Sequence, residues 1–184
     1  MHSEAFDKAI RFAAVAHQGQ LRKGTDVPYI VHPFAVASIL RQQQCPEAVV
    51  IAGLLHDTIE DTDVTLALIR DQFGDGIAGL VDACTEPEKS LPWEQRKKAM
   101  IERAVSADPQ VKWIMCADKY HNLSTMSREF QTTGENLWNR FSRGYDQQKW
   151  YMHAMTKALQ CNLPEKYHKP MFVHLHKLVN RFFN

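Results

Sequence analysis

The sequence predicts an all-α fold, arranged as one compact helical domain over residues 1–184. Apolar residues recur at intervals of three and four along most of the chain, which is the period of amphipathic helices. No segment alternates apolar and polar residues over the length of a strand, and no internal repeat is present. A length of 184 residues, with 45% hydrophobic and 23% charged residues, is typical of one globular domain.

Capping residues and prolines mark the first two predicted helices. Ser3 is a candidate N-cap for the first helix. The polar stretch HQGQLRKGTDVP follows, and its glycines and proline predict a loop. Pro33 suits the first turn of a second helix, because the missing N–H of proline costs nothing at that position.

Three further helices are predicted before residue 85. Pro46 begins one of them, PEAVVIAGLLHDTIED, which is apolar on nearly every side and is therefore predicted to be central. Thr62 or Asp63 is expected to cap a short helix that ends near Gly74. The last of the three covers Ile77–Cys84.

The second half of the chain continues the helical pattern. TEPEKSLP is predicted to be a loop, and Trp93–Val105 an exposed helix rich in Lys, Arg and Glu. Asp108 and Pro109 begin the helix DPQVKWIMCADKYHNLSTM, and two or three helices complete the chain through WYMHAMTKAL and MFVHLHKLVNRFF. Four aromatic residues of this half are expected in the core or at an interface: Trp138, Phe141, Trp150 and Tyr151.

Charge and composition exclude several classes of partner. The formal net charge is +1, so no overall field attracts the protein to nucleic acid or to an anionic membrane. The N-terminal stretch MHSEAFDKAIRF lacks the apolar segment of a secretory signal, and no apolar run approaches the ~20 residues of a membrane span. We therefore expect a cytoplasmic protein that binds neither nucleic acid nor membrane.

The cysteines do not suggest a zinc ribbon or a disulfide framework. Cys45, Cys84, Cys116 and Cys161 are widely spaced, and no CxxC pair occurs. We expect all four to be buried thiols in a reducing compartment, because a free cysteine behaves as a small hydrophobic residue.

A metal site is predicted from His32, the doublet His56-Asp57, and Asp118. Asp57 follows the apolar run VVIAGLL and Asp118 follows WIMCA, so both carboxylates are placed where the chain is expected to enter the core. Burying an ionised carboxylate costs several kcal/mol unless it is paired or bound to a metal. Two imidazoles and two carboxylates suit Mn²⁺, Fe²⁺ or a similar ion, with coordination positions left open for water and substrate.

Glu60 and Asp61 are candidates for activating that water. On a continuous helix they lie one turn beyond His56 and Asp57, on the metal-facing side. A carboxylate there is placed to take a proton from water, although Asp61 also fits an ordinary helix end.

Four other residues are candidate substrate contacts. Asn122 and Thr125 follow Asp118 at i+4 and i+7, so they share its helix face, and their amide and hydroxyl suit a base or sugar. Arg22 and Lys23, in the glycine-rich loop before His32, are suited to anchoring a pyrophosphate.

Three segments together resemble a known family. AHQGQLRKGTDVPYIVHP, GLLHDTIEDTD and ADKYHNLSTM resemble, in order and spacing, the HD-type hydrolase domain of the RelA/SpoT-type alarmone enzymes. The resemblance covers most of residues 3–126, and the chain is too short for the synthetase and regulatory domains of the long enzymes. It is therefore similar to a stand-alone small alarmone hydrolase.

The resemblance implies removal of the 3′-pyrophosphate from ppGpp and pppGpp, with one Mn²⁺ per chain. It also implies the same roles for the residues named above: metal ligation by the four histidine and aspartate residues, water activation by Glu60 and Asp61, and substrate contacts by Arg22, Lys23, Asn122 and Thr125.

The chain departs from its relatives at two places near the expected nucleotide pocket. Ser124 stands where longer relatives commonly have Arg, and the loop between Lys23 and Pro28 is one residue longer than in some of them. The base therefore stays open. The same fold acting on adenosine alarmones, or on the 2′-phosphate of NADPH, is an alternative, and a silent nucleotide-binding module is a third. The sequence does not determine the oligomeric state.

Overall fold

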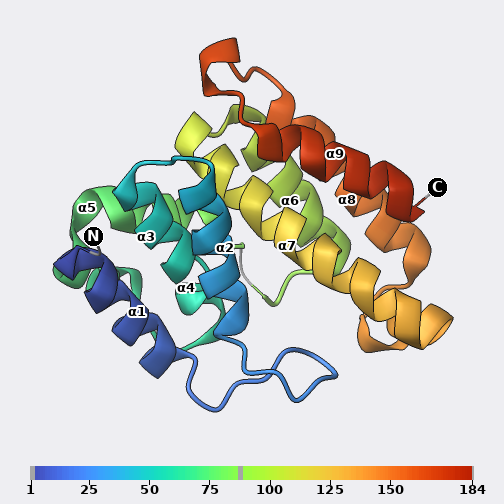
Figure 1. Cartoon of the computed structure of the whole chain (residues 1–184), viewed down its shortest axis with the longest axis horizontal. Coiled ribbons are helices and arrows are strands. Elements are labelled where there is room, and N and C mark those ends of the chain that lie inside the picture. The colour runs from blue at the N-terminus through green and yellow to red at the C-terminus, as the bar shows by residue number, and fades with distance from the viewer. Residues whose placement is uncertain (1–2, 87–88, 184) are drawn as a thin grey trace. The chain divides into compact units, whose positions relative to one another are not determined.

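The computed structural model describes residues 3–86 and 89–183, and these residues confirm the all-α prediction. Within them the only β-type pairing is an isolated antiparallel bridge between Leu21 and Pro28. The chain divides into two compact units, residues 1–86 and 87–184 (Figure 1). None of the helices in the described residues is both long and apolar enough to cross a bilayer.

The first unit is built around a short apolar helix. It contains α1 (Glu4–Ala16), α2 (Val31–Gln42), α3 (Glu47–Leu55), α4 (Thr58–Asp61) and α5 (Leu66–Cys84). Helix α3 contacts α1, α2 and α5, and every residue of it from Val49 onward is buried, as its all-round apolar sequence predicts. Gly53 permits the close approach of α2, since a Cβ atom there would lie 2.3 Å from Cδ1 of Leu40.

The helix predicted from Pro46 through Asp61 is interrupted, so its expected continuity was wrong. Helix α3 ends at Leu55, and α4 begins only at Thr58. Side chains at the break bond to main-chain carbonyls: Thr58 Oγ1 donates to Leu55 O at 2.7 Å, and His56 Nδ1 lies 2.8 Å from Gly53 O. The break therefore places His56 and Asp57 in a turn between two helices.

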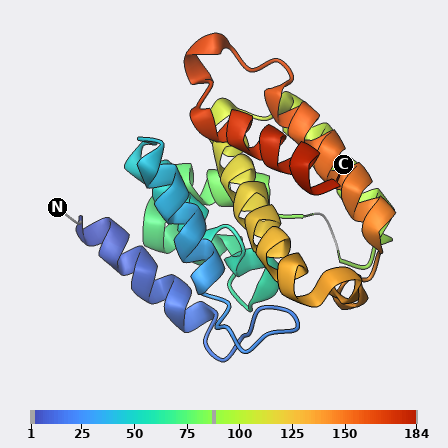
Figure 2. The same ribbon diagram turned by 45° about the vertical axis from the view of Figure 1, so that its right-hand side comes forward.

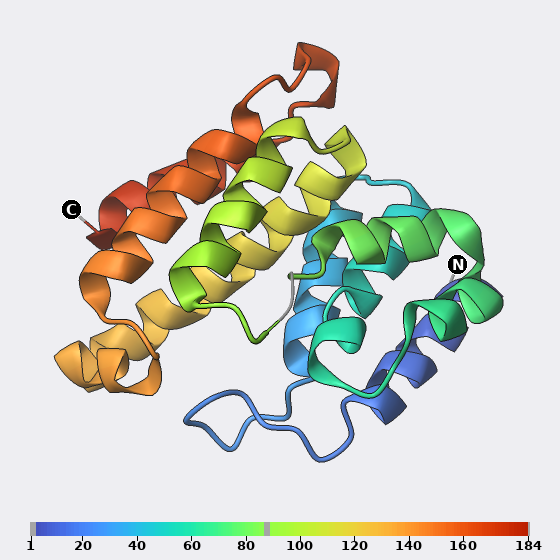
Figure 3. The ribbon, with the colours of Figure 1, turned by 180° about the vertical axis from the view of Figure 1, so that it is seen from behind.

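The helix pair predicted around Gly74 is present, but its cap is not the expected one. Gly74 has φ +84° and ψ 165°, which bends α5 into two pieces (Figure 3). The N-cap is Thr65, whose hydroxyl accepts a hydrogen bond from Leu68 N. Thr62 instead ends α4, and its hydroxyl donates to Thr58 O.

The second unit packs around the longest helix of the chain. It contains α6 (Trp93–Ser106), α7 (Pro109–Thr133), η1 (Gly134–Arg140), α8 (Tyr145–Gln160), η2 (Glu165–Tyr167) and α9 (Pro170–Phe183). Helix α7 contacts α6, α8, α9 and η1, and Figure 2 shows α9 beside it. Asp108 caps α7 by accepting from Gln110 N, as predicted.

Two features hold the second unit together. Trp138 is buried among aromatic rings, with Tyr145 at 5.2 Å and Phe182 at 6.0 Å between centroids. Lys112 is also buried, and its Nζ donates to carbonyls at the ends of two helices, Val105 O at 3.0 Å and Cys161 O. The aromatic cluster therefore joins η1 to α8 and α9, and the buried Lys112 cation joins α7 to the ends of α6 and α8.

Some expectations about individual side chains were wrong. No disulfide joins the four cysteines, but only Cys116 is buried, whereas Cys45 and Cys84 are half-buried and Cys161 is exposed. Trp150 was expected in the core or at an interface; it is 39% exposed and contacts Trp93, which excludes only the core position. The loop predicted for residues 85–92 lies partly outside the described residues, at 87 and 88.

Candidate active site

Three of the four predicted metal ligands meet in the first unit. His32 lies in the first turn of α2, and His56 and Asp57 lie in the turn between α3 and α4. His56 Nε2 is 3.1 Å from Asp57 Oδ1, and His32 Nε2 is 3.4 Å from Asp57 Oδ2. A ring nitrogen of each histidine lies within 4.8 Å of one on the other, and both side chains are buried.

The orientation of His56 favours a cation in this cluster. A carbonyl oxygen only accepts hydrogen bonds, so the contact with Gly53 O assigns the ring proton to Nδ1. When Nδ1 carries the only ring proton, Nε2 presents a lone pair toward the Asp57 carboxylate. Two electron-rich groups at this distance are stabilised by a positive ion between them, and histidines that bind metals commonly bond a carbonyl through the other nitrogen.

Tyr29 links Asp57 to Asp61, which sequence reasoning did not foresee. Its hydroxyl lies 2.7 Å from Asp57 Oδ2 and 3.0 Å from Asp61 Oδ2, so its single proton is shared between the two carboxylates. Burial, and then the charge of Asp57, raises the pKa of Tyr29 above its ordinary value, so the phenol stays a neutral donor. The sequence offered one indication of this role: Tyr29 lies three residues before His32, just ahead of the start of α2, and so close to a predicted metal ligand.

The loop before α2 holds Tyr29 in place. Tyr29 N donates to Gln20 O at 2.8 Å, and the Gln20 side chain donates to Asp61 O at 2.6 Å. His17 lies against the tyrosine ring, 5.0 Å away between centroids, and bonds the Gln20 side chain through Nδ1. This loop and helix α4 are thus connected directly through hydrogen bonds.

Tyr29→Phe is expected to weaken metal binding and to lower kcat, each by roughly 10–100-fold, which is the usual cost of losing a hydrogen bond to a metal ligand. The ring is retained, so the packing of His17 and His32 should not change. Calorimetric titration with Mn²⁺ measures the first effect and steady-state kinetics the second. Tyr167→Phe, in the second unit, is the matched control. Wild-type affinity and kcat in Tyr29→Phe would show that the hydroxyl positions nothing.

Glu60 and Asp61 both lie on α4, in different surroundings. The Glu60 carboxylate accepts from Glu86 N at 3.3 Å. Burial is the main cause that raises the pKa of Glu60 to about 7, and the charges of Glu86, Asp57 and Asp61 add to it. A carboxylate with a pKa near neutrality can exchange a proton with water at physiological pH.

The Arg22 side chain contacts the ring of Tyr29, whose hydroxyl bonds the carboxylates of Asp57 and Asp61. Its guanidinium is 5.4 Å from the centroid of the Tyr29 ring, and the side chain is half-buried. The loop closes through Arg22 N, which donates to Val27 O at 2.8 Å, and Gly24 has φ +73°. Lys23 is exposed on the same turn. The two cations therefore belong to the loop that carries Tyr29.

The remaining predicted residues lie in the second unit, on α7. Asn122 Nδ2 donates to Asp118 Oδ1, and Lys119 Nζ donates to Asp118 Oδ2. Thr125 accepts a long hydrogen bond, 3.4 Å, from Arg128. Lys119 was not among the predicted residues, although it adjoins Asp118 in the chain. A metal-ligand role for Asp118 stays a prediction, as do the substrate roles of Asn122 and Thr125.

Ser124 does not share the face of these residues. It lies six positions after Asp118, about 240° round the helix, and it lines a groove between α7 and α9. Its expected position near the nucleotide pocket stays a prediction.

The fold and the cluster define a class: an all-helical protein with a buried histidine–aspartate site suited to a divalent metal. A family model described as HD domain matches residues 9–143, and the chain belongs to this family.

Proteins with assigned activities are similar to much of the chain. It is 41% identical over 133 residues to human guanosine-3′,5′-bis(diphosphate) 3′-pyrophosphohydrolase MESH1, which covers 70% of this chain and 74% of MESH1. It is 42% identical over 123 residues to the GTP pyrophosphokinase of Streptomyces coelicolor, covering 65% of this chain. The chain spans only 14% of that longer protein.

Two solved structures have the same fold. A crystal structure of a Listeria monocytogenes protein matches with TM-score 0.78 and 41% identity, over 83% of this chain and 98% of that one. A metazoan ortholog of SpoT, described as hydrolysing ppGpp, matches with TM-score 0.80 and 28% identity, over 98% of this chain and 97% of its own.

Proposed function

We propose that the protein hydrolyses the 3′-pyrophosphate of guanosine alarmones, converting ppGpp to GDP and pppGpp to GTP, with release of pyrophosphate. The observation that carries the proposal is the cluster of His32, His56 and Asp57, in a chain that belongs to the HD-domain family. Its similarity to MESH1 over most of both chains supports this substrate class.

The cofactor in this proposal is one Mn²⁺ per chain, held by His32, His56, Asp57 and Asp118. Two imidazole nitrogens with carboxylate oxygens suit Mn²⁺ and similar ions, and the described ligands contain no thiolate that would favour a structural zinc. When bound, such an ion polarises a phosphoryl oxygen and makes a water more acidic. The orientation of the His56 ring by Gly53 O serves this ligand role.

In the proposed reaction, the carboxylates of Glu60 and Asp61 act on the attacking water. Water attacks the phosphorus joined to the 3′ oxygen, the P–O3′ bond breaks, and pyrophosphate leaves. In this proposal Glu60, with its pKa near 7, takes the proton of the attacking water and passes it to the 3′ oxygen as the P–O3′ bond breaks. Asp61 is held by Tyr29 beside the same cluster and assists in orienting that water.

Substrate contacts follow from the remaining groups. Arg22 and Lys23 bind the phosphates, because the Arg22 guanidinium lies over Tyr29 and hence near the cluster. Asn122 and Thr125 bind the nucleoside with their amide and hydroxyl groups. We also propose that residues 1–184 act as one HD domain in the cytoplasm. The family match from 9 to 143 includes parts of both compact units, and no disulfide joins the four cysteines.

Product analysis tests the proposed reaction. The enzyme with Mn²⁺ is incubated with ppGpp, with ppApp and with NADPH, and the products are separated by ion-exchange chromatography. We expect GDP and intact pyrophosphate from ppGpp in one step. Sequential release of orthophosphate, or activity only on NADPH, would exclude the alarmone assignment. Activity only on ppApp would move it to adenosine alarmones, and no turnover of any substrate would favour a silent binding module.

Arg22→Ala is expected to raise KM for every phosphorylated substrate, with a loss in binding of roughly 1.5–3 kcal/mol for one charged hydrogen-bonding group. The loss should shrink as salt is added, because exposed charges are screened. Steady-state kinetics at several ionic strengths measure it. Arg70→Ala, which removes an exposed arginine paired with Asp75 in the same unit, is the control. An unchanged KM in Arg22→Ala would remove this residue from the substrate site.

A further inference from the structure

A groove between α7 and α9, within the second unit, has the composition of an anion site. Its cavity volume is about 610 Å³, which lies in the usual range for small-molecule sites. Three of its lining residues are cations, Arg128 on α7 and Lys177 and Arg181 on α9. Its lining contains no carboxylate. The groove therefore carries local positive charge, although the net charge of the chain is only +1.

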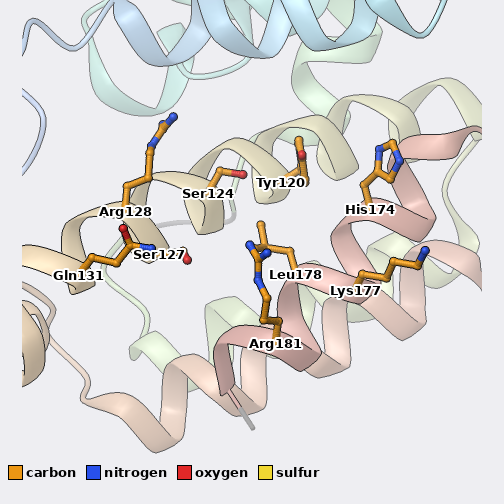
Figure 4. Close-up of a pocket in the computed structure, with 9 residues that line it drawn as sticks. All are labelled: Tyr120, Ser124, Ser127, Arg128, Gln131, His174, Lys177, Leu178 and Arg181. Carbon is orange, nitrogen blue, oxygen red and sulfur yellow. The ribbon is translucent and has the colours of Figure 1, made fainter.

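The two α9 cations are available to a ligand. Within residues 3–86 and 89–183 no carboxylate forms an ion pair with Lys177 or Arg181, whereas Arg140 and Arg143 of the same unit are paired with Glu129 and Glu94. Figure 4 shows the Arg181 side chain rising from α9 toward α7. Arginine binds phosphate oxygens with two parallel hydrogen bonds, so this placement suits a phosphate group in the groove.

One end of the groove is aromatic. The Tyr120 and His174 rings lie 6.3 Å apart between centroids, and Figure 4 shows both near the end where Lys177 projects. A planar base stacks on such rings, and the stacking tolerates any base. The hydroxyl of Ser124 lies on the α7 wall between the aromatic end and Arg128. The aromatic end of the groove therefore suits the base of a nucleotide, and the neighbouring cations suit its phosphates.

The groove also lies on a different face of α7 from Asp118 and Asn122. Tyr120 and Ser124 are about 200° round α7 from Asp118 and Asn122 respectively, since each pair is two residues apart in the chain. We propose that the α7–α9 groove is a second, non-catalytic binding site for a nucleoside polyphosphate, whose phosphates contact Lys177 and Arg181 and whose base stacks at Tyr120 and His174.

Calorimetric titration of the full chain with GTP tests this site, because GTP has no 3′ phosphate for the proposed reaction to remove. We expect two binding events in wild type. The double variant Lys177→Glu/Arg181→Glu should lose one of them, with at least about tenfold weaker binding, and should keep its kcat on ppGpp. Arg22→Ala should weaken the other event and leave the groove event intact.

The control is Lys157→Glu/Lys166→Glu, which changes the net charge equally at exposed positions outside the groove. It should keep both events. The same isotherm from the groove variant and from wild type would overturn the inference, as would equal losses in the groove variant and its control. The assay measures binding alone, so failure of the proposed hydrolysis would leave its result interpretable. Tyr120→Ala should weaken the binding of GTP in the groove more than the binding of inorganic pyrophosphate there. Equal losses of affinity for the two ligands would contradict base stacking.

Discussion

Asp57→Ala is expected to abolish turnover and most metal binding. Asp57 is the residue on which the cluster converges: its two oxygens lie 3.1 Å from His56 Nε2 and 3.4 Å from His32 Nε2, and one of them accepts from Tyr29. The substitution removes a charged ligand and leaves two buried imidazoles facing each other. Metal content per chain, measured by plasma mass spectrometry, and the rate with ppGpp report the two effects.

The control for this experiment is Asp63→Ala, an exposed aspartate shortly after α4. It should keep metal and rate near wild type. A circular dichroism spectrum establishes that Asp57→Ala remains helical, so that loss of metal is not loss of fold. A full metal complement with a near-normal rate in Asp57→Ala would contradict the proposed site at its centre.

Glu60→Gln and Asp61→Asn are each expected to lower kcat by roughly 10²-fold or more while metal content stays intact. The amides keep the size of the side chains and remove only their capacity to accept a proton. Metal analysis and single-turnover kinetics separate the two effects. Glu47→Gln, an exposed glutamate in the first turn of α3, is the control. An unchanged kcat in both variants would assign the pair a purely structural role.

The pKa of Glu60 also predicts how stability changes with pH in the metal-free protein. Its ordinary value of 4.5 applies to the unfolded chain, and burial raises it to about 7 in the fold. Between these values the folded state binds more protons, so stability should fall as pH rises, by up to about 1.4 kcal/mol per pH unit. Below about pH 4.5 this carboxyl contributes no slope. Denaturant unfolding at pH 5 and 7 measures the change, and Glu60→Gln should remove it.

Helix type and order were predictable from the sequence because caps and prolines are local signals. Asp108 before Pro109 and Ser3 before Glu4 act as the caps expected of them. The bend at Gly74 was also placed correctly, because only glycine adopts that backbone angle without strain. The histidine–aspartate cluster followed from ionisable residues placed after buried runs, which is again visible in sequence order.

The features that were missed depend on side chains that bond to distant or main-chain groups. Periodicity could not reveal the break between Leu55 and Thr58, because the hydrogen bonds to Gly53 O and Leu55 O that accompany it come from side chains that also fit a continuous helix. Tyr29 contacts Asp57 across 28 positions in the chain, and no local pattern encodes that contact.

Gly53, in the hydrophobic core, influences how closely the two histidines of the predicted metal site approach each other. Gly53 lets α2 approach α3 so closely that a methyl group there would overlap Leu40, and its carbonyl orients His56. His32 is carried by α2, and His56 follows directly after α3. The distance between the two imidazoles is thus a direct function of the spacing between these helices. A larger residue at position 53 would push α2 and α3 apart and move His32 away from His56, so a substitution in the hydrophobic interior should weaken metal binding although it changes no ligand.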